Sequence, residues 1–193
     1  MLLALLVLLP GAAGCSPGRA GATAAEAAIT VDSIRPIEVE LARFRESVGG
    51  REVRALRGGA TSRDELVARF GQALAAHDTA ALSALLLDAQ EFAWLYYPYT
   101  VYTHPPYRQA PGMVWLLTAQ NSEKGLRRVL ERFGGRDPAL AGYACRTTEP
   151  QDLNVLHGDC AVRLAGDTTG RRLFGTIIER DGRFKFVSYA NGL

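Results

Sequence analysis

This chain of 193 residues has few lysines, no long apolar run and no marked excess of charge of either sign. The apolar run Leu2–Leu9 falls far short of the roughly 20 residues that a membrane-spanning helix needs. Lysine occurs only at Lys124 and Lys185, and the 22 basic residues are balanced by 20 acidic ones without a block of either sign. We therefore expect no anchor helix in this run and no nucleic-acid-binding surface.

The common catalytic and cofactor-binding motifs are also missing. The sequence contains no Gly-x-Ser-x-Gly, no phosphate loop and no dinucleotide fingerprint. Its histidines, His77, His104 and His157, lie on separate segments without the i, i+4 spacing that presents two metal ligands together. We predict neither a metal site nor a cofactor.

The N-terminal residues indicate export. The apolar run is followed by Pro10-Gly11 and by small residues before Cys15, an order typical of a signal peptide. The stretch Ala12–Cys15 resembles a bacterial lipobox, in which the cysteine becomes the lipidated first residue. Ala12 replaces the usual leucine and no basic residue precedes the run, so ordinary secretion with an incidental Cys15 is the alternative.

We accordingly predict a signal peptide over residues 1–14 and a lipid-anchored tether of small residues over 15–34. The lipid on Cys15 would hold the protein in the bacterial cell envelope, outside the cytoplasm and on the periplasmic face.

Two cysteines remain for a disulfide in such an oxidising compartment. Cys145 and Cys160 are symmetric about the boundary between Asp152 and Leu153, so a hairpin centred there places them opposite each other. Closing a loop of this length stabilises a domain by about 3 kcal/mol in the chain-entropy model. A catalytic thiol is the alternative, but the sequence has no Cys-x-x-Cys motif.

Residues 35–61 are predicted to form an accessory helix and a linker. Asp32 or Ser33 can cap the helix, Pro36 suits its first turn and Gly49-Gly50 ends it. One apolar face is formed by Ile37, Leu41, Phe44 and Val48.

The main domain is predicted over residues 62–193. Ser62 and Glu65 form a capping box, in which the glutamate reaches back to the cap. Four helices follow, and the last, from Pro111-Gly112 to Gly134-Gly135, is expected to be interrupted near Asn121 or Ser122. The expected helix ranges are about 63–76, 79–86, 89–96 and 112–133.

After Pro138 the apolar period changes to two, which is typical of strands. We expect strands at about 140–148, 155–164, 172–180 and 183–190, with Asp181-Gly182 as a two-residue hairpin turn. That turn places Leu173, Ile177, Phe184 and Phe186 on one face, assigned to the core. It places Arg180, Arg183 and Lys185 on the other face.

Helices followed by antiparallel strands indicate the α+β class. The stretches FGQALAAHDTAALSALLLDAQEFAWLY and GTIIERDGRFKFVSYANGL resemble the nuclear transport factor 2-like superfamily, which includes SnoaL-like polyketide cyclases. The resemblance implies a cone-shaped, cystatin-like roll, in which the N-terminal helices pack in a curved antiparallel sheet of about four strands. It also implies a pocket at the open end, in a superfamily of isomerases, dehydratases, cyclases and binding domains.

A tract rich in tyrosine and proline runs from Gln90 to Pro111. Its part Tyr96–Pro111 is predicted to replace the first strand of the cone with a proline-stiffened loop that frames the open end, because a tyrosine ring can face the pocket while its hydroxyl meets water. Packing in the core is the alternative for several of its rings. The candidate ligand-binding residues are Trp94, Tyr97, Tyr99, Tyr102, Trp115, Phe184 and Phe186.

Acid–base catalysis has three candidate residues, Asp88, Glu91 and His104. The superfamily's catalytic set does not map onto this chain, since Phe70 stands where a tyrosine is expected. Structural roles are favoured for these acidic residues: Asp88 is expected to cap a helix and Glu91 to face solvent. Likewise, His77 is expected at a helix end and His157 at the surface.

Three functions remain open. The favoured one is a lipoprotein that binds a small apolar or partly polar molecule without catalysis. The second is an isomerase, dehydratase or cyclase. The third is an assembly module or homodimer that would expose an apolar patch around Phe174, Val187 and Tyr189.

Overall fold

The computed structural model describes residues 35–192, which belong to one compact unit beginning at Arg35. The predicted signal peptide, the lipobox with Cys15 and the cap candidates Asp32 and Ser33 lie outside the described residues. No helix among the described residues is long and apolar enough to cross a membrane.

Helices make up the first two thirds of the described chain. The α-helices are α1 Ile37–Ser47, α2 Arg63–Ala75, α3 Thr79–Ala84, α4 Ala89–Glu91 and α5 Pro111–Phe133. Between α4 and α5 the chain forms a π-helical turn, η1 Phe92–Tyr96, and two 3₁₀ turns, η2 Tyr97–Tyr99 and η3 Val101–Thr103. The predicted order of helices is confirmed.

Local capping explains where α2 begins. The Ser62 hydroxyl accepts a hydrogen bond from the Glu65 backbone N–H at 3.0 Å, as predicted. The Glu65 carboxylate reaches one residue further back than predicted and accepts from the Thr61 N–H at 2.6 Å. These contacts lower the Glu65 pKa from 4.5 to about 2, chiefly through the Thr61 hydroxyl and N–H, with Arg69 as a further partner.

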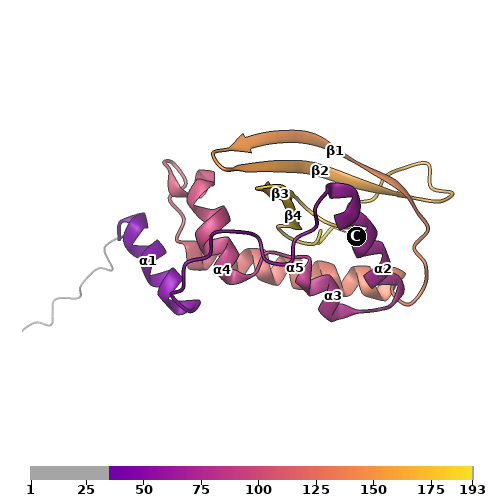
Figure 1. Ribbon diagram of the computed structural model, residues 1–193, viewed down its shortest axis with the longest axis horizontal. Coiled ribbons are helices and arrows are strands. Elements are labelled where there is room, and N and C mark those ends of the chain that lie inside the picture. Colours follow the sequence, from indigo (N-terminus) through magenta and orange to yellow (C-terminus); the bar gives the residue numbers. More distant parts are fainter. Residues whose placement is uncertain (1–34, 193) are drawn as a thin grey trace, which may run out of the picture. The chain divides into compact units, whose positions relative to one another are not determined.

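The strands form one antiparallel sheet in the order β1-β2-β3-β4, so the α+β class is confirmed (Figure 1). They span β1 Leu140–Gln151, β2 Asn154–Leu164, β3 Ile177–Arg180 and β4 Arg183–Phe186. The last two are shorter than predicted. Asp181 and Gly182 have positive φ and pair Arg180 with Arg183, as the hairpin prediction required.

The predicted disulfide is confirmed. Cys145 and Cys160 are partners in the β1–β2 register and their sulfur atoms are bonded. The hairpin turns between Gln151 and Asn154, where Asp152 has positive φ.

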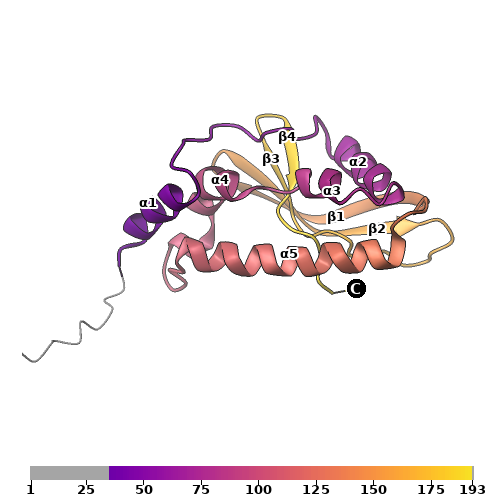
Figure 2. The same cartoon turned by 90° about the horizontal axis from the view of Figure 1, so that it is seen from below.

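The long helix α5 runs beside the sheet without the predicted interruption (Figure 2). The prediction failed because polar residues in its middle serve tertiary contacts. The Ser122 hydroxyl accepts from the Tyr189 N–H at 2.9 Å. At Gly125, a Cβ atom would lie 2.5 Å from the Ala190 carbonyl oxygen, so only glycine allows this approach.

The main core lies between the sheet and helices α2, α3 and α5. Phe70 is fully buried and contacts the rings of Phe174, Phe186 and Tyr189, with centroids 5.6–5.9 Å away. Leu173, Ile177, Phe184 and Phe186 lie in this core, as predicted.

The predicted assembly patch is wrong. Phe174, Val187 and Tyr189 are 1%, 8% and 2% exposed, so they form no open apolar surface. The two-fold period assigned them to an outer face. That assignment failed because Phe174 and Tyr189 lie beyond the short strands β3 and β4 and join the main core.

Val187 is buried because a second apolar cluster covers the other face of β3 and β4. This cluster contains Leu56, Leu87, Leu95, Leu156, Ile178 and Val187. The segments around Ala60 and Leu86 pair with β4, and Arg180 and Lys185 are buried there rather than solvated.

Within residues 35–192, the exposed large apolar side chains come from only a few segments, which together are here called the apolar end. Its members are Val39, Val101, Tyr107, Met113, Leu116, Leu117 and Leu153. They come from α1, the η3–α5 segment, the first turns of α5 and the β1–β2 turn. In the views of Figures 1 and 2 these elements lie at the end where the chain enters α1. Within residues 35–192, helices α2 and α3 expose none.

Candidate functional site

The tyrosine–proline tract folds back on itself through helical turns, where a loop was predicted. The buried Tyr97 hydroxyl donates to the Gln109 carbonyl oxygen at 2.5 Å, and the Gln109 N–H donates to the Tyr102 carbonyl at 3.0 Å. Burial raises the pKa of Tyr97 to about 12, with the charge of Glu38 as a smaller cause. These bonds fix the positions of Tyr102 and Gln109 relative to the start of α5.

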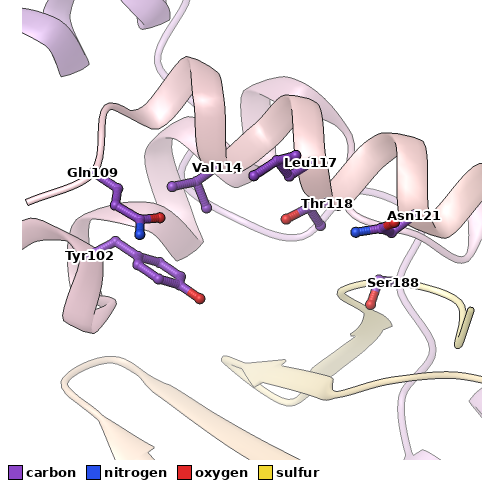
Figure 3. A pocket seen from close by; sticks show the side chains of 7 residues that line it. All are labelled: Tyr102, Gln109, Val114, Leu117, Thr118, Asn121 and Ser188. Carbon is purple, nitrogen blue, oxygen red and sulfur yellow. The ribbon is translucent and has the colours of Figure 1, made fainter. Parts of the chain in front are cut away.

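A cavity of about 280 Å³ opens between this tract, α5 and the segment after β4. We call it the Tyr102 cavity. It is lined by Tyr102, Gln109, Val114, Leu117, Thr118, Asn121 and Ser188. Figure 3 shows Tyr102 and Ser188 on opposite sides of a space that α5 borders from above.

Polar groups on the cavity wall have open hydrogen-bonding capacity. Within the described part of the chain, the side chains of Tyr102, Gln109, Thr118 and Ser188 have no hydrogen-bond partner. Asn121 has one, since its side-chain oxygen accepts from the Asn191 amide at 3.2 Å. Three hydroxyls and two amides are therefore available to a ligand, beside the apolar Val114 and Leu117.

This wall suits binding better than proton transfer. Of the described residues that line it, none carries a carboxylate, an imidazole or a thiol. Hydroxyls and amides orient a ligand through hydrogen bonds, and the two apolar side chains supply contact area. The cavity is slightly smaller than the roughly 300–1,000 Å³ of drug-sized sites, so its ligand would be small.

A second hollow of about 220 Å³ adjoins α5. Trp115 lines it together with Leu87 and Val187, and Thr118 lines both hollows. Two of the predicted ligand-binding residues, Tyr102 and Trp115, thus lie on cavity walls.

The other predicted ligand-binding residues lie elsewhere. Tyr97 and Phe186 are fully buried, and Phe184 is 9% exposed within the main core. Trp94 stacks under the Arg45 guanidinium at 3.9 Å, and Tyr99 lies 5.6 Å from that of Arg180. The structure gives these five side chains packing contacts rather than a shared cavity.

The interpretation of Glu91 as solvent-facing is wrong. Glu91 has no exposed surface, and Lys185 donates to its Oε2 at 2.7 Å. The Glu91 carboxylate also accepts hydrogen bonds from the backbone N–H groups of Asp88 and Arg57, at 3.0 and 2.5 Å. Sequence reasoning missed the pair because Glu91 and Lys185 are 94 residues apart. The enclosed carboxylate thus joins α4 to β4 and has no exposed surface.

Asp88 and His104 do not join Glu91 in a catalytic group. Asp88 caps α4, as predicted, by accepting from the Glu91 N–H at 2.9 Å, and its other oxygen pairs with Arg57. His104 is exposed between η3 and the cis Pro105-Pro106 bond.

His157 is buried, so its predicted surface position is wrong. Its Nε2 lies 3.0 Å from a Glu179 oxygen, and its Nδ1 lies 3.3 Å from the Thr148 hydroxyl. The ring stacks beside that of Phe184 of β4. His77 follows the end of α2, as predicted. Among residues 35–192 no three His, Cys, Asp or Glu side chains are grouped closely enough for a metal ion.

Sequence reasoning also missed most of the cavity wall, namely Gln109, Val114, Leu117, Thr118, Asn121 and Ser188. One signal was present in α5, because residues 114, 117, 118 and 121 follow i, i+3, i+4, i+7 spacing and share one face. Two of these four residues, Thr118 and Asn121, are polar, which is unusual for a helix face that packs beside a hydrophobic core.

Comparison of the chain with protein-family models, with curated proteins and with solved structures finds no significant match. The geometry of the site is therefore the basis for any statement about function.

Proposed function

We propose that this protein is a bacterial cell-envelope lipoprotein that binds a small, partly polar molecule in the Tyr102 cavity. The observation that carries the proposal is the convergence of open hydroxyl and amide groups from three separate segments on one cavity. Phe70 and the rings around it are buried in the main core, so the ligand would bind outside that core.

The proposal includes a fold and an anchor. The domain would be a cone-shaped, cystatin-like roll of the nuclear transport factor 2-like kind, with the Tyr102 cavity at its open end. The position of the cavity between α5 and the segment that follows β4 supports this assignment. The sequence Ala12–Cys15 supports a lipid anchor on Cys15.

Native mass spectrometry tests the binding function. A chain that begins at Ser16 keeps the whole compact unit and should carry extra mass from bacterial extract that disappears on denaturation. Tyr102→Phe and Thr118→Val should reduce this extra mass, whereas Tyr107→Phe, on an exposed tyrosine of the same tract, should not. A bare native protein that also binds no member of a fragment library contradicts the function.

The anchor is tested separately on the full chain produced in bacteria. The expected mass is that of a chain beginning at Cys15 with a diacylglyceryl group, and Cys15→Ser should abolish the modification. An unmodified Cys15 contradicts the anchor and leaves the binding function untouched.

A further inference from the structure

The exposed large apolar side chains are distributed unevenly over the described surface. All of the exposed large apolar or aromatic side chains among residues 35–192 belong to the apolar end. Met113 and Leu116 are 55% and 47% exposed and, with Leu117, follow the i, i+3, i+4 spacing of one helical stripe. Such clustering on a monomer's surface marks an interaction site.

The charge distribution of this region distinguishes between possible partners. From Phe92 to Ser122 the chain has no acidic residue, and Arg108 is its only charged residue apart from the titratable His104. Val101, Met113 and Leu116 belong to this segment, which brings no carboxylate to repel anionic phospholipid headgroups. Elsewhere in the apolar end, Glu38 and Glu40 flank Val39, and Asp152 precedes Leu153. Tyrosine also suits the boundary between headgroups and acyl chains, because its ring is apolar and its hydroxyl is polar.

The path of the chain supports the same partner. The described chain begins at Arg35, next to α1, which contacts the start of α5: Phe44 lies 3.7 Å from the position of a Cβ on Gly112. Twenty residues separate Cys15 from Arg35, and fully extended they reach at most about 70 Å. A membrane anchor at Cys15 would thus keep the apolar end close to the bilayer, where even a weak contact is populated.

We propose that the apolar end rests on the membrane surface, with Val101, Met113 and Leu116 inserted among the phospholipid headgroups. This inference rests on the proposed lipid anchor at Cys15. The contact would hold the domain in one orientation and place the Tyr102 cavity, which shares Leu117 with the apolar end, beside the bilayer.

Tryptophan quenching tests the contact without a foreign label. The chain has two tryptophans, Trp94 and Trp115, and both belong to the acid-free stretch. Because Cys145 and Cys160 are bonded to each other, a chain beginning at Cys15 has one free thiol. Coupling that thiol to a maleimide lipid in vesicles of phosphatidylethanolamine and phosphatidylglycerol reproduces the anchor whether or not cells lipidate Cys15.

Brominated acyl chains in these vesicles should quench the tryptophan fluorescence of the parent protein. The variant Val101→Ser, Met113→Ser, Leu116→Ser, which leaves the cavity wall intact, should lower the quenching about twofold or more. The control Ala68→Ser, Ala76→Ser, Ala80→Ser changes exposed residues of α2, its C-cap and α3 and should be quenched like the parent. Circular dichroism should show all three proteins equally folded.

Two results would overturn the proposal. One is a parent protein that is not quenched, or is quenched as strongly as the Val101, Met113 and Leu116 variant. The other is a parent protein that forms a dimer through the apolar end, shown by loss of the dimer in this variant, because this surface would then be buried against a second copy of the chain. Absence of lipid on Cys15 in cells would instead remove the natural anchor, and this measurement would not be affected.

Discussion

The packed half of the domain, around Phe70, and the apolar end, which includes Tyr107, contain similar aromatic side chains in opposite surroundings. Phe70, Phe174 and Phe186 are at most 1% exposed and contact one another. Tyr102 and Tyr107 also contact each other, with ring centroids 6.3 Å apart, yet Tyr107 is 56% exposed. Aromatic burial stabilises the first region, whereas the second keeps its rings available at the surface.

The largest loss of stability should come from removing a buried side chain in the packed half. Phe70→Ala should lower the free energy of unfolding by about 3–5 kcal/mol, because it leaves a cavity among fully buried rings. Met113→Ala at the apolar end should change it by less than about 0.5 kcal/mol, since half of that side chain is already in water. Denaturant unfolding of both variants measures the contrast.

Equal losses for the two substitutions would break the comparison. They would mean that the apolar end is buried in solution, for example against a second copy of the chain. Repeating the Met113→Ala measurement over a range of protein concentrations separates these cases.

A large effect is also expected at the buried Glu91–Lys185 pair. Lys185→Met should cost about 3–5 kcal/mol of unfolding free energy, because the Glu91 carboxylate stays buried without its cation. The double variant Glu91→Gln, Lys185→Met should recover part of this loss. If the single variant unfolds no more readily than the parent at neutral pH, the structural role given to Glu91 is wrong.

The disulfide should have a smaller effect. Replacing Cys145 and Cys160 together by serine should remove about 3 kcal/mol for a 15-residue loop. The loss should appear as a lower melting temperature, and the parent protein should show it in a strong reductant. A melting temperature that neither treatment changes would contradict it.

The smallest effect concerns Glu65, a partly exposed carboxylate in the packed half. Its pKa is lowered from 4.5 to about 2, so the unfolded chain binds more protons between these values. The stabilisation by Glu65 is therefore present above about pH 4.5 and is lost as the pH falls through about 2. Urea midpoints of the parent and Glu65→Gln should differ at pH 7 and converge near pH 2.

Glu131→Gln is a suitable control, since this exposed carboxylate accepts no hydrogen bond from the described residues. Its midpoint should follow that of the parent at every pH. A gap between parent and Glu65→Gln that persists at pH 2 would show that Glu65 acts through something other than its charge.

Features that depend on neighbouring residues could be predicted from the sequence. The Ser62 cap needs only a backbone N–H three residues ahead, and the Asp181-Gly182 turn needs only two positive φ angles. The Cys145–Cys160 bridge followed from symmetry about one hairpin turn. The helix order and the α+β class depend on the period of apolar residues, which each segment carries by itself.

The tertiary structure alone decided what happens between segments distant along the chain. It buried Glu91 against Lys185, covered the outer face of β3 and β4, and turned Phe174 and Tyr189 into core residues. It also brought Tyr102, Thr118 and Ser188 to one cavity. Apolar periodicity assigns a residue to a face of its own element. Only packing decides whether that face meets water, a buried partner or an open cavity.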